Sequence, residues 1–307
     1  MKKYLTFILI TLILTSCENT VQNTVVSVKE RLIYVNDSQY TIKGICYHPV
    51  PKGSPNKRSW ETLTQDLALM NEAGINTIRV YAPIDDIKAL DEINEAGIKV
   101  IIGFGYKQGG KNDIESGSFV NYINKYKNHK AILMWEFGNE YNYHPEWFNG
   151  DIKNWYKAMN DAADLAHRND ANHPTTTAHG DLPSAEALAM SPNIDVWGMN
   201  VYRSVRPETI FKEWKVVSSK PMYLSETGAD SYMQIAKDDY AQGEYRFVAT
   251  ALNKVVMAAP ENDEARQLLA DTYEQLGYQA EGAGWRNIYL TGAQELRVGI
   301  QAGAPKT

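Results

Sequence analysis

The chain has 307 residues, of which 44% are hydrophobic and 22% are charged, a balance typical of a folded globular protein. Its formal net charge of −6 at pH 7 gives no reason to expect a nucleic-acid partner. A (β/α)8 barrel usually takes about 250 residues, so the length leaves room for one barrel and little else.

The first 17 residues have the layout of an export signal. Two lysines precede an apolar run from Leu5 to Leu14, which is too short to favour a membrane-spanning helix. The Leu-Thr-Ser-Cys sequence that ends at Cys17 resembles a bacterial lipoprotein signal, in which the cysteine is lipidated and becomes the first mature residue. The resemblance implies an exported, lipid-anchored protein of the bacterial cell envelope. An uncleaved anchor or an ordinary export signal is the alternative.

Residues 18–25 are polar and predict a linker. The chain has two cysteines, so acylation of Cys17 would leave Cys46 as the only other thiol. No internal disulfide is then expected, and stability must come from the hydrophobic core.

From residue 26 onward, short apolar strands alternate with amphipathic helices. Two strands at 25–28 and 32–35 predict a hairpin that closes the bottom of a barrel. Seven further strands are predicted at 41–47, 75–81, 98–104, 131–140, 174–179, 195–202 and 221–226. Helices are predicted between them at 60–73, 84–96, 119–126, 151–168, 184–190 and 208–217. This alternation predicts a parallel α/β sheet, and seven strands with helices between them favour a TIM-type barrel over an open Rossmann sheet.

No Gly-x-Gly-x-x-Gly or Walker pattern follows any of these strands, which argues against a nucleotide site. Two of the strands instead end on a glutamate: one on Asn139-Glu140 and another on Glu226. Barrel enzymes carry their functional groups at the carboxyl ends of the strands. The period of two places Met134, Glu136 and Gly138 on the same side as Glu140.

Three phrases in order resemble the clan A glycoside hydrolases: Gly-Ile-Asn-Thr-Ile-Arg-Val-Tyr around Arg79, Asn139-Glu140, and Leu-Ser-Glu-Thr-Gly around Glu226. The similarity covers about residues 40–230 and is strongest to family 2 barrel domains and β-1,3-glucanosyltransferase-like enzymes. It implies that Glu140 is the acid/base and Glu226 the nucleophile of a retaining enzyme. It also implies that Tyr202 hydrogen-bonds the nucleophile and that Asn139 contacts the sugar 2-hydroxyl.

Arg79 faces inward on the second strand and is expected to hold the charge of Glu226. Glu136 is better interpreted as the buried ion-pair partner of Arg79 than as a catalytic group. His179 and His48 lie at strand ends, where each either lines a sugar subsite or is a satisfied structural histidine. Two loop aromatics, Tyr106 and Trp147, are either sugar platforms or loop anchors. No His/Asp/Cys cluster predicts a metal site, and no cofactor is expected.

The pattern after residue 235 is helical. Two helices at 236–258 and 261–276, joined at Ala259-Pro260, predict a hairpin of the tetratricopeptide type. Residues from about 234 to 299 resemble the helical dimerisation region of bacterial alkylsulfatases, which implies a possible homodimer through these helices. None of the six histidines forms a His-x-His motif, so the zinc chemistry of those enzymes does not come with the segment.

A closed barrel needs an eighth strand, and the 81 residues after Glu226 (307 − 226) are helical in pattern. Residues 285–290 are the best strand candidate, but their apolar positions also suit a helix face, which is the favoured interpretation. The expected architecture is therefore a TIM-type barrel over residues 26–235 without a normal eighth strand, followed by a helical segment over residues 236–307. Unpaired edges beside Glu226 predict low stability and weak activity.

The expected function is that of a retaining β-glycosidase or transglycosylase, which acts on a β-glucan-like polysaccharide by a two-carboxylate double displacement. The alternative is a non-catalytic, glycan-binding surface lipoprotein with a defective barrel and a helical tail for association. The intact pair Glu140 and Glu226 favours the first, and the missing eighth strand favours the second.

Overall fold

The computed structural model describes residues 24–51, 53–54, 57–106, 112–203, 206–228 and 232–299. The predicted signal segment with Cys17, and almost all of the predicted linker, lie outside these residues. Within them, no helix is both long and apolar enough to cross a membrane.

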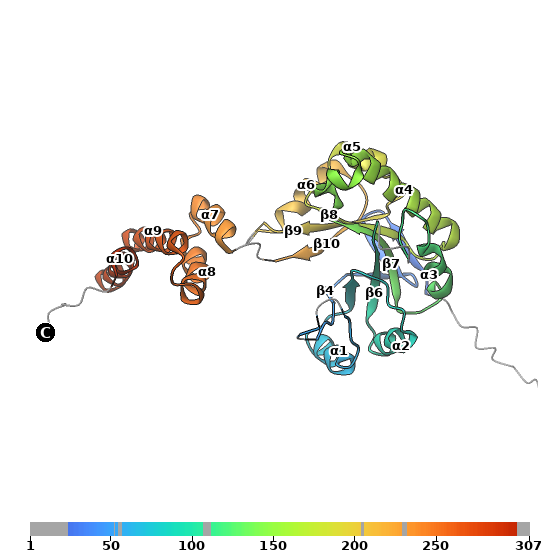
Figure 1. The fold of residues 1–307 in the computed structure, drawn as a ribbon, viewed down its shortest axis with the longest axis horizontal. Helices are drawn as coiled ribbons and strands as arrows, with labels where there is room; N and C mark the ends of the chain where they lie inside the picture. Colours follow the sequence, from blue (N-terminus) through green and yellow to red (C-terminus); the bar gives the residue numbers. More distant parts are fainter. Residues whose placement is uncertain are drawn as a thin grey trace, which may run out of the picture.

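Seven parallel strands form one curved sheet in the order β10-β9-β8-β7-β6-β5-β4 (Figure 1). Their bounds are β4 (Gly44–Cys46), β5 (Thr77–Val80), β6 (Lys99–Phe104), β7 (Ile132–Asn139), β8 (Thr175–Gly180), β9 (Val196–Val201) and β10 (Met222–Thr227). The helices between them are α1 (Leu63–Glu72), α2 (Ile87–Glu95), α3 (Phe119–Tyr126), α4 (Ile152–Asn169), α5 (Ala185–Met190) and α6 (Thr209–Val217). The predicted TIM-type architecture is confirmed, and most predicted ends differ from the observed ones by only a few residues.

The main core lies between the strands and the helices that cover them. Trp135 and Phe137 point outward from β7 into this layer, as the period of two predicts, and both are fully buried. Phe104 of β6 packs against both rings, with centroids 6.0 and 5.8 Å away. Burying one such side chain stabilises the fold by about 1.5–3 kcal/mol.

A three-stranded antiparallel sheet covers one end of the barrel interior. It consists of β1 (Val26–Lys29), β2 (Leu32–Val35) and β3 (Ser38–Tyr40), with β2 in the middle. The first two strands were expected and the third was not. Asn36 and Asp37 join β2 to β3 with φ values of 48° and 64°, the left-handed conformation that tight hairpin turns require. Val26 and Ile33 pack against the inward-facing side chains of the barrel, so the hairpin closes that end as predicted.

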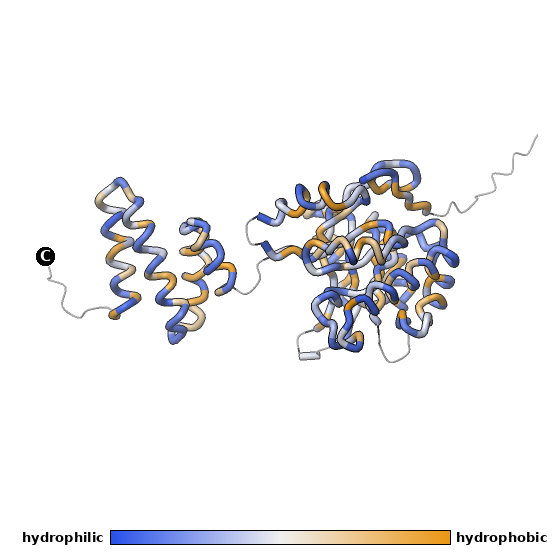
Figure 2. Tube along the Cα trace, turned by 90° about the horizontal axis from the view of Figure 1, so that it is seen from above, coloured by the Kyte–Doolittle hydropathy of each residue, from blue (hydrophilic) through white to orange (hydrophobic). Residues whose placement is uncertain are grey.

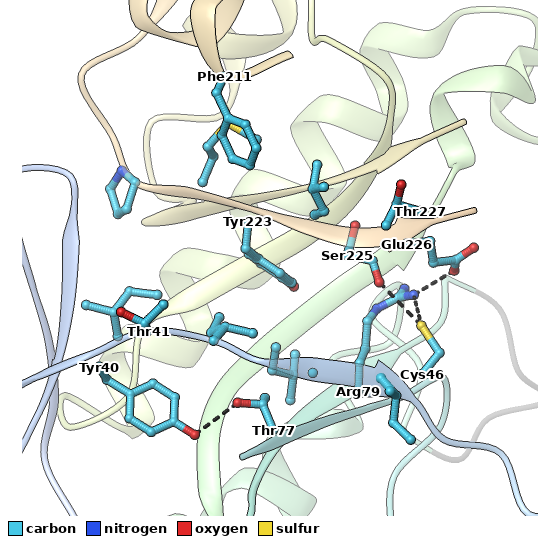
Figure 3. A pocket seen from close by; sticks show the side chains of 18 of the residues that line it. Tyr40, Thr41, Cys46, Thr77, Arg79, Phe211, Tyr223, Ser225, Glu226 and Thr227 are labelled. Carbon is cyan, nitrogen blue, oxygen red and sulfur yellow. Dashed lines mark hydrogen bonds and ion pairs between the residues drawn. The ribbon is translucent and has the colours of Figure 1, made fainter. Parts of the chain in front are cut away.

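Strands β4 and β10 do not pair with each other, and no described strand lies between them. A cavity of about 780 Å³ lies between them, lined by residues of both strands, among them Glu226 of β10, and also by Leu32 and Ile33 of β2 (Figure 3). Cys46 of β4 reaches across it, because its Sγ lies 3.3 Å from the carbonyl oxygen of Ser225 and donates to it. The expected absence of an eighth strand is therefore confirmed for the residues that the structure describes.

The C-terminal segment forms four helices, α7 (Tyr232–Gln242), α8 (Tyr245–Ala258), α9 (Asp263–Gln279) and α10 (Ala283–Val298). The prediction of a single helix over 236–258 is wrong, because Gly243 has a φ of 82° and ends α7 there. The helix interpretation of residues 285–290 is confirmed, since they lie within α10.

Helices α7, α8 and α9 pack through a core of their own, and Leu296 of α10 packs against it; the core is made by Ala236, Val248, Leu252, Ala265 and Leu269. Hydrophobic and hydrophilic stretches alternate along these helices (Figure 2), as expected for helices that bury one face. Arg206, which follows β9, forms an ion pair with Glu244 between α7 and α8.

Candidate active site

Arg79 lies at the centre of the candidate site, on β5, with only 3% of its surface exposed. Its Nε and Nη2 donate to the Glu136 carboxylate at 2.7 and 2.8 Å, in the bidentate geometry typical of strong guanidinium pairs. Its Nη1 donates to Glu226 Oε1 at 2.7 Å (Figure 3). One cation therefore holds two carboxylates. Burial acts to lower the pKa of Arg79, but the adjacent Glu136 outweighs it and keeps the pKa raised.

Glu226 stands at the carboxyl end of β10, and its side chain is 14% exposed. Besides the bond from Arg79, its carboxylate accepts hydrogen bonds from the hydroxyls of Tyr81 at 2.9 Å and Tyr202 at 2.7 Å. Burial alone would raise the pKa of Glu226. The hydrogen bonds from Tyr202 and Arg79 favour the charged form more strongly, and the net pKa is lowered. The arrangement therefore keeps Glu226 ionised.

Asn139 is the last residue of β7 and is tied into the same network. Its Oδ1 accepts from Arg79 Nη2 at 2.8 Å and from Asn200 Nδ2 at 3.1 Å. Asn200 Oδ1 in turn accepts from the Ser225 hydroxyl at 2.7 Å. Because the oxygen of the Asn139 amide faces these donors, its Nδ2 remains as a donor for another group.

Glu140 follows directly and has a φ of 55°, which a non-glycine residue adopts only at a cost of about 1–3 kcal/mol. Its backbone N–H donates to the carbonyl of Ala178 at 2.8 Å, which fixes the strained turn. The Glu140 carboxylate has no hydrogen-bond partner among the described residues. It lines a pocket of about 350 Å³ together with Glu136 and Asn139. The charge of Glu140 adds to burial and to Glu226 in raising the pKa of Tyr202, so the two carboxylates share one electrostatic environment.

The predicted site residues Arg79, Asn139, Glu140, Tyr202 and Glu226 thus meet at one end of the barrel. His179 does not join them. It points outward from β8, with its ring 6.3 Å from Tyr156 of α4 and 5.8 Å from Trp197 of β9. Burial lowers its pKa, and it is a core histidine between sheet and helices rather than a residue that contacts substrate. His48 remains near the site, with its exposed ring 6.3 Å from that of Tyr81.

Tyr81 and Ser225 also belong to this hydrogen-bond network and were not among the predicted site residues. Tyr81 follows Arg79 by two positions, so the period of two already places both on the same face. Ser225 directly precedes Glu226, and its hydroxyl reaches Asn200 because the pairing of β10 with β9 shifts between Leu224 and Glu226. Such an irregularity has no sequence signature.

Among the residues that the structure describes, no group of three or more His, Cys, Asp and Glu side chains is arranged to hold a metal ion. The predicted buried ion pair between Arg79 and Glu136 is confirmed by geometry. The chemistry that the site offers is that of carboxylates, hydroxyls and amides.

The alkyl sulfatase dimerisation model matches residues 202–299. Over 74 residues the chain is 55% identical to a linear primary-alkylsulfatase of a Pseudomonas species, which is 24% of this chain and 11% of that protein. It is 24% identical over 221 residues to a putative β-glucuronidase of Formosa agariphila, which is 69% of this chain and 26% of that protein. The chain thus spans about a tenth of the alkylsulfatases and about a quarter of the glucuronidase.

Solved structures share the fold at low identity. The β-D-glucuronidase of Dictyoglomus thermophilum matches 67% of this chain and 39% of its own, with a TM-score of 0.54 and 20% identity. Bacteroides uniformis β-glucuronidase 2, covalently bound to cyclophellitol-6-carboxylate aziridine, matches 81% of this chain and 31% of its own, with a TM-score of 0.57 and 17% identity. The model of glycosyl hydrolases family 2, TIM barrel domain, matches residues 26–245, which is most of the chain. The chain therefore belongs to glycosyl hydrolase family 2 through its TIM barrel domain.

Proposed function

We propose that the protein is a retaining β-glycosidase or transglycosylase in which Glu226 is the nucleophile and Glu140 the acid/base. One observation carries the proposal. Glu226 accepts three hydrogen bonds, from Arg79, Tyr81 and Tyr202, whereas the Glu140 carboxylate has no hydrogen-bond partner among the described residues. A nucleophile must stay ionised, and an acid/base must gain and lose a proton, so the two environments suit the two roles.

The reaction proceeds in two displacements. The ionised Glu226 attacks the anomeric carbon, the bond from that carbon to the glycosidic oxygen breaks, and Glu140 gives its proton to the leaving oxygen. A water molecule or a sugar hydroxyl then attacks the glycosyl ester, Glu140 takes its proton, and Glu226 leaves as a carboxylate. Two inversions retain the configuration at the anomeric carbon.

Asn139 supports the sugar in this scheme. Its Oδ1 is occupied by Arg79 and Asn200, so its Nδ2 is the group that donates to a sugar hydroxyl. Asn200 and Ser225 orient the amide and need not touch the substrate themselves. This arrangement supports the role of Asn139 at the 2-hydroxyl that the family resemblance implies.

A neutral sugar, as in a β-glucan, is the substrate that the lining of the site favours. The described basic side chains that line the two pockets are Arg31, Arg79 and His144. Arg79 is committed to Glu136 and Glu226, and His144 bonds Glu146 at 2.8 Å. Arg31 lies at the far end of the long cavity and donates to the carbonyl oxygens of Ser218 and Lys215. None of these basic side chains is free beside Glu226 to bind the carboxylate of a uronic acid, in contrast to what the names of the glucuronidase relatives suggest.

The gap between β4 and β10 supports a second candidate function, a glycan-binding protein without turnover. Glu226 lies on β10, whose outer edge has no strand beside it in the described residues. A displacement of about 1 Å at the nucleophile costs on the order of a hundredfold in rate. We therefore expect turnover to be slow for a glycosidase.

Turnover by the purified protein separates the two functions. The test uses aryl β-glucosides, aryl β-glucuronides and β-glucan polysaccharides. We expect slow release from the neutral glucosides and less from the glucuronides. Glu226→Gln should abolish the activity, and Glu140→Gln should slow natural substrates more than activated aryl glycosides, because a good leaving group needs little protonation. Equal losses on all substrates in both variants would point to structural roles for the two carboxylates.

Two further proposals concern partners. The match of residues 202–299 to the alkylsulfatase dimerisation family supports a homodimer through α7–α10. The Leu-Thr-Ser-Cys sequence supports an exported protein anchored by a lipid on Cys17.

A further inference from the structure

The loop between β7 and α4 is fixed firmly at the edge of the pocket beside Glu140. It contains two short 3-10 helices, η1 (Tyr141–Tyr143) and η2 (Pro145–Phe148). The Asn142 side chain bonds both backbone groups of Gly180, accepting from its N–H at 2.8 Å and donating to its carbonyl at 3.1 Å. The Tyr143 ring lies where a side chain at Gly180 would stand, and Phe148 is 1% exposed. The loop is therefore a rigid support.

Trp147 stands out on this support because it is 53% exposed while its neighbour Phe148 is buried. Its ring stacks on that of His144, with centroids 3.8 Å apart and planes 7° from parallel. The edge of Tyr141 contacts it from the side, with centroids 5.5 Å apart. Single exposed aromatics are common on proteins, but this one is held in a fixed orientation and lines the pocket that contains Glu140.

This pocket lies on the acid/base side of the site. Glu140, Trp147 and His144 line it, and Tyr81, which donates to Glu226, borders it as well. Glu226 itself lines the long cavity between β4 and β10 instead. The acid/base must lie beside the oxygen of the departing group. The sugar that leaves with that oxygen therefore extends from Glu140 into the pocket, whose volume of about 350 Å³ falls in the range of small-ligand sites.

We propose that Trp147, backed by His144, is the platform of a leaving-group subsite that binds the departing sugar ring through its apolar C–H face. The inference rests on the proposed function, because it takes Glu140 as the acid/base. The face of an aromatic ring is electron-rich and attracts the polarised C–H groups of a sugar. The same platform would hold an acceptor sugar during transglycosylation.

Binding without turnover is the first test. In the Glu226→Gln background, laminaribiose and cellobiose are titrated by calorimetry. Trp147→Ala should weaken the binding of the better disaccharide by about tenfold or more, the equivalent of about 1.4 kcal/mol. Trp147→Phe keeps an aromatic face and should retain most of the affinity. Trp285→Ala removes a tryptophan that is 65% exposed in α10 and is the matched control, with no effect expected.

Turnover is the second test, with β-glucosyl fluoride and β-linked oligosaccharides as substrates. Trp147→Ala should lower kcat/KM for the oligosaccharides, mostly through KM, and by a smaller factor for the fluoride, whose leaving group carries no ring. Trp147-dependent binding without turnover by any variant would refute the catalytic proposal and leave the platform standing. Disaccharide binding that is equal in the Ala variant and its parent, or absent from the parent at millimolar concentrations, would overturn the platform.

Discussion

Arg79 places one positive charge between two carboxylates, and its contacts decide which of them is available for chemistry. Glu136 is 2% exposed and takes a bidentate bond, so it neutralises the guanidinium inside the barrel. Glu226 takes the remaining Nη1 and stays 14% exposed beside the cavity. The alternation of side chains along a strand was enough to predict both partners. The same alternation gave no warning that His179 faces the helices, because a polar residue at a strand end fits either side.

The hydroxyl of Tyr202 should set the acid limit of activity. The pKa of Glu226 is lowered from its ordinary value of 4.5. The ionised nucleophile is therefore fully present at pH values above 4.5 and is lost only as the pH falls through the lowered pKa. Tyr202→Phe removes one donor from the carboxylate. The acid limb of the kcat/KM profile should then move to higher pH by about one unit, since a hydrogen bond to a charged group is worth about 1.5–3 kcal/mol.

The control for this profile is Tyr278→Phe, because Tyr278 is an exposed tyrosine of α9 that also donates to a glutamate, Glu274. It should leave the acid limb in place. An unchanged limb in Tyr202→Phe would mean that Tyr202 does not govern the ionisation of the nucleophile.

At the scale of single elements, the inward direction of Glu136 on β7 could be predicted from the sequence, but the irregular carboxyl end of this strand could not. The period of two holds from Met134 to Glu136, which faces inward as predicted, whereas Leu133 and Met134 both join the inner cluster because the pairing with β6 shifts at that point. The pairing with β8 then shifts between Glu136 and Asn139, and Gly138 has a φ of 75°. The shift turns Asn139 inward as well, toward Arg79. The ring of Trp155 occupies the space that a side chain at Gly138 would need, and such tertiary contacts are not visible in a strand pattern.

For strands β4 and β10 the sequence predicted correctly that no described strand lies between them. Residues 285–290 offered apolar positions that fitted either a strand or a helix, and their helical spacing proved decisive. The three residues of β4 are exposed because only β5 pairs with them. An apolar strand with an open edge tends to associate with other strands, so low stability remains the expectation for this barrel.

At the scale of the whole molecule, the chain joins a family 2 barrel to helices that match an alkylsulfatase dimerisation model, and the two matches overlap between residues 202 and 245. The break between α7 and α8 at Gly243 was missed, because one glycine within a helical pattern is often tolerated. The helical segment retains a core of its own. This organisation suits a barrel that carries the site and helices that serve association.

Cys17→Ser tests the proposals on anchoring and association together. Loss of the acylated cysteine should move the protein from the membrane fraction to the soluble fraction, because an apolar run of this length does not favour a spanning helix. The soluble variant should then have about twice the mass of one chain in light scattering. Retention in the membrane with an unprocessed N-terminus would indicate an uncleaved anchor, and the mass of a single chain would contradict the homodimer.

The most direct test of the central claim is to find which residue becomes covalently attached to a β-configured, uncharged cyclophellitol aziridine. This type of reagent reacts with the nucleophile of a retaining glycosidase, and the protein is then digested and mapped by mass spectrometry. We predict a single adduct on Glu226 that is absent from Glu226→Gln and still forms in Trp285→Ala. An adduct on another carboxylate, or glycoside hydrolysis that inverts the anomeric configuration, would contradict the account.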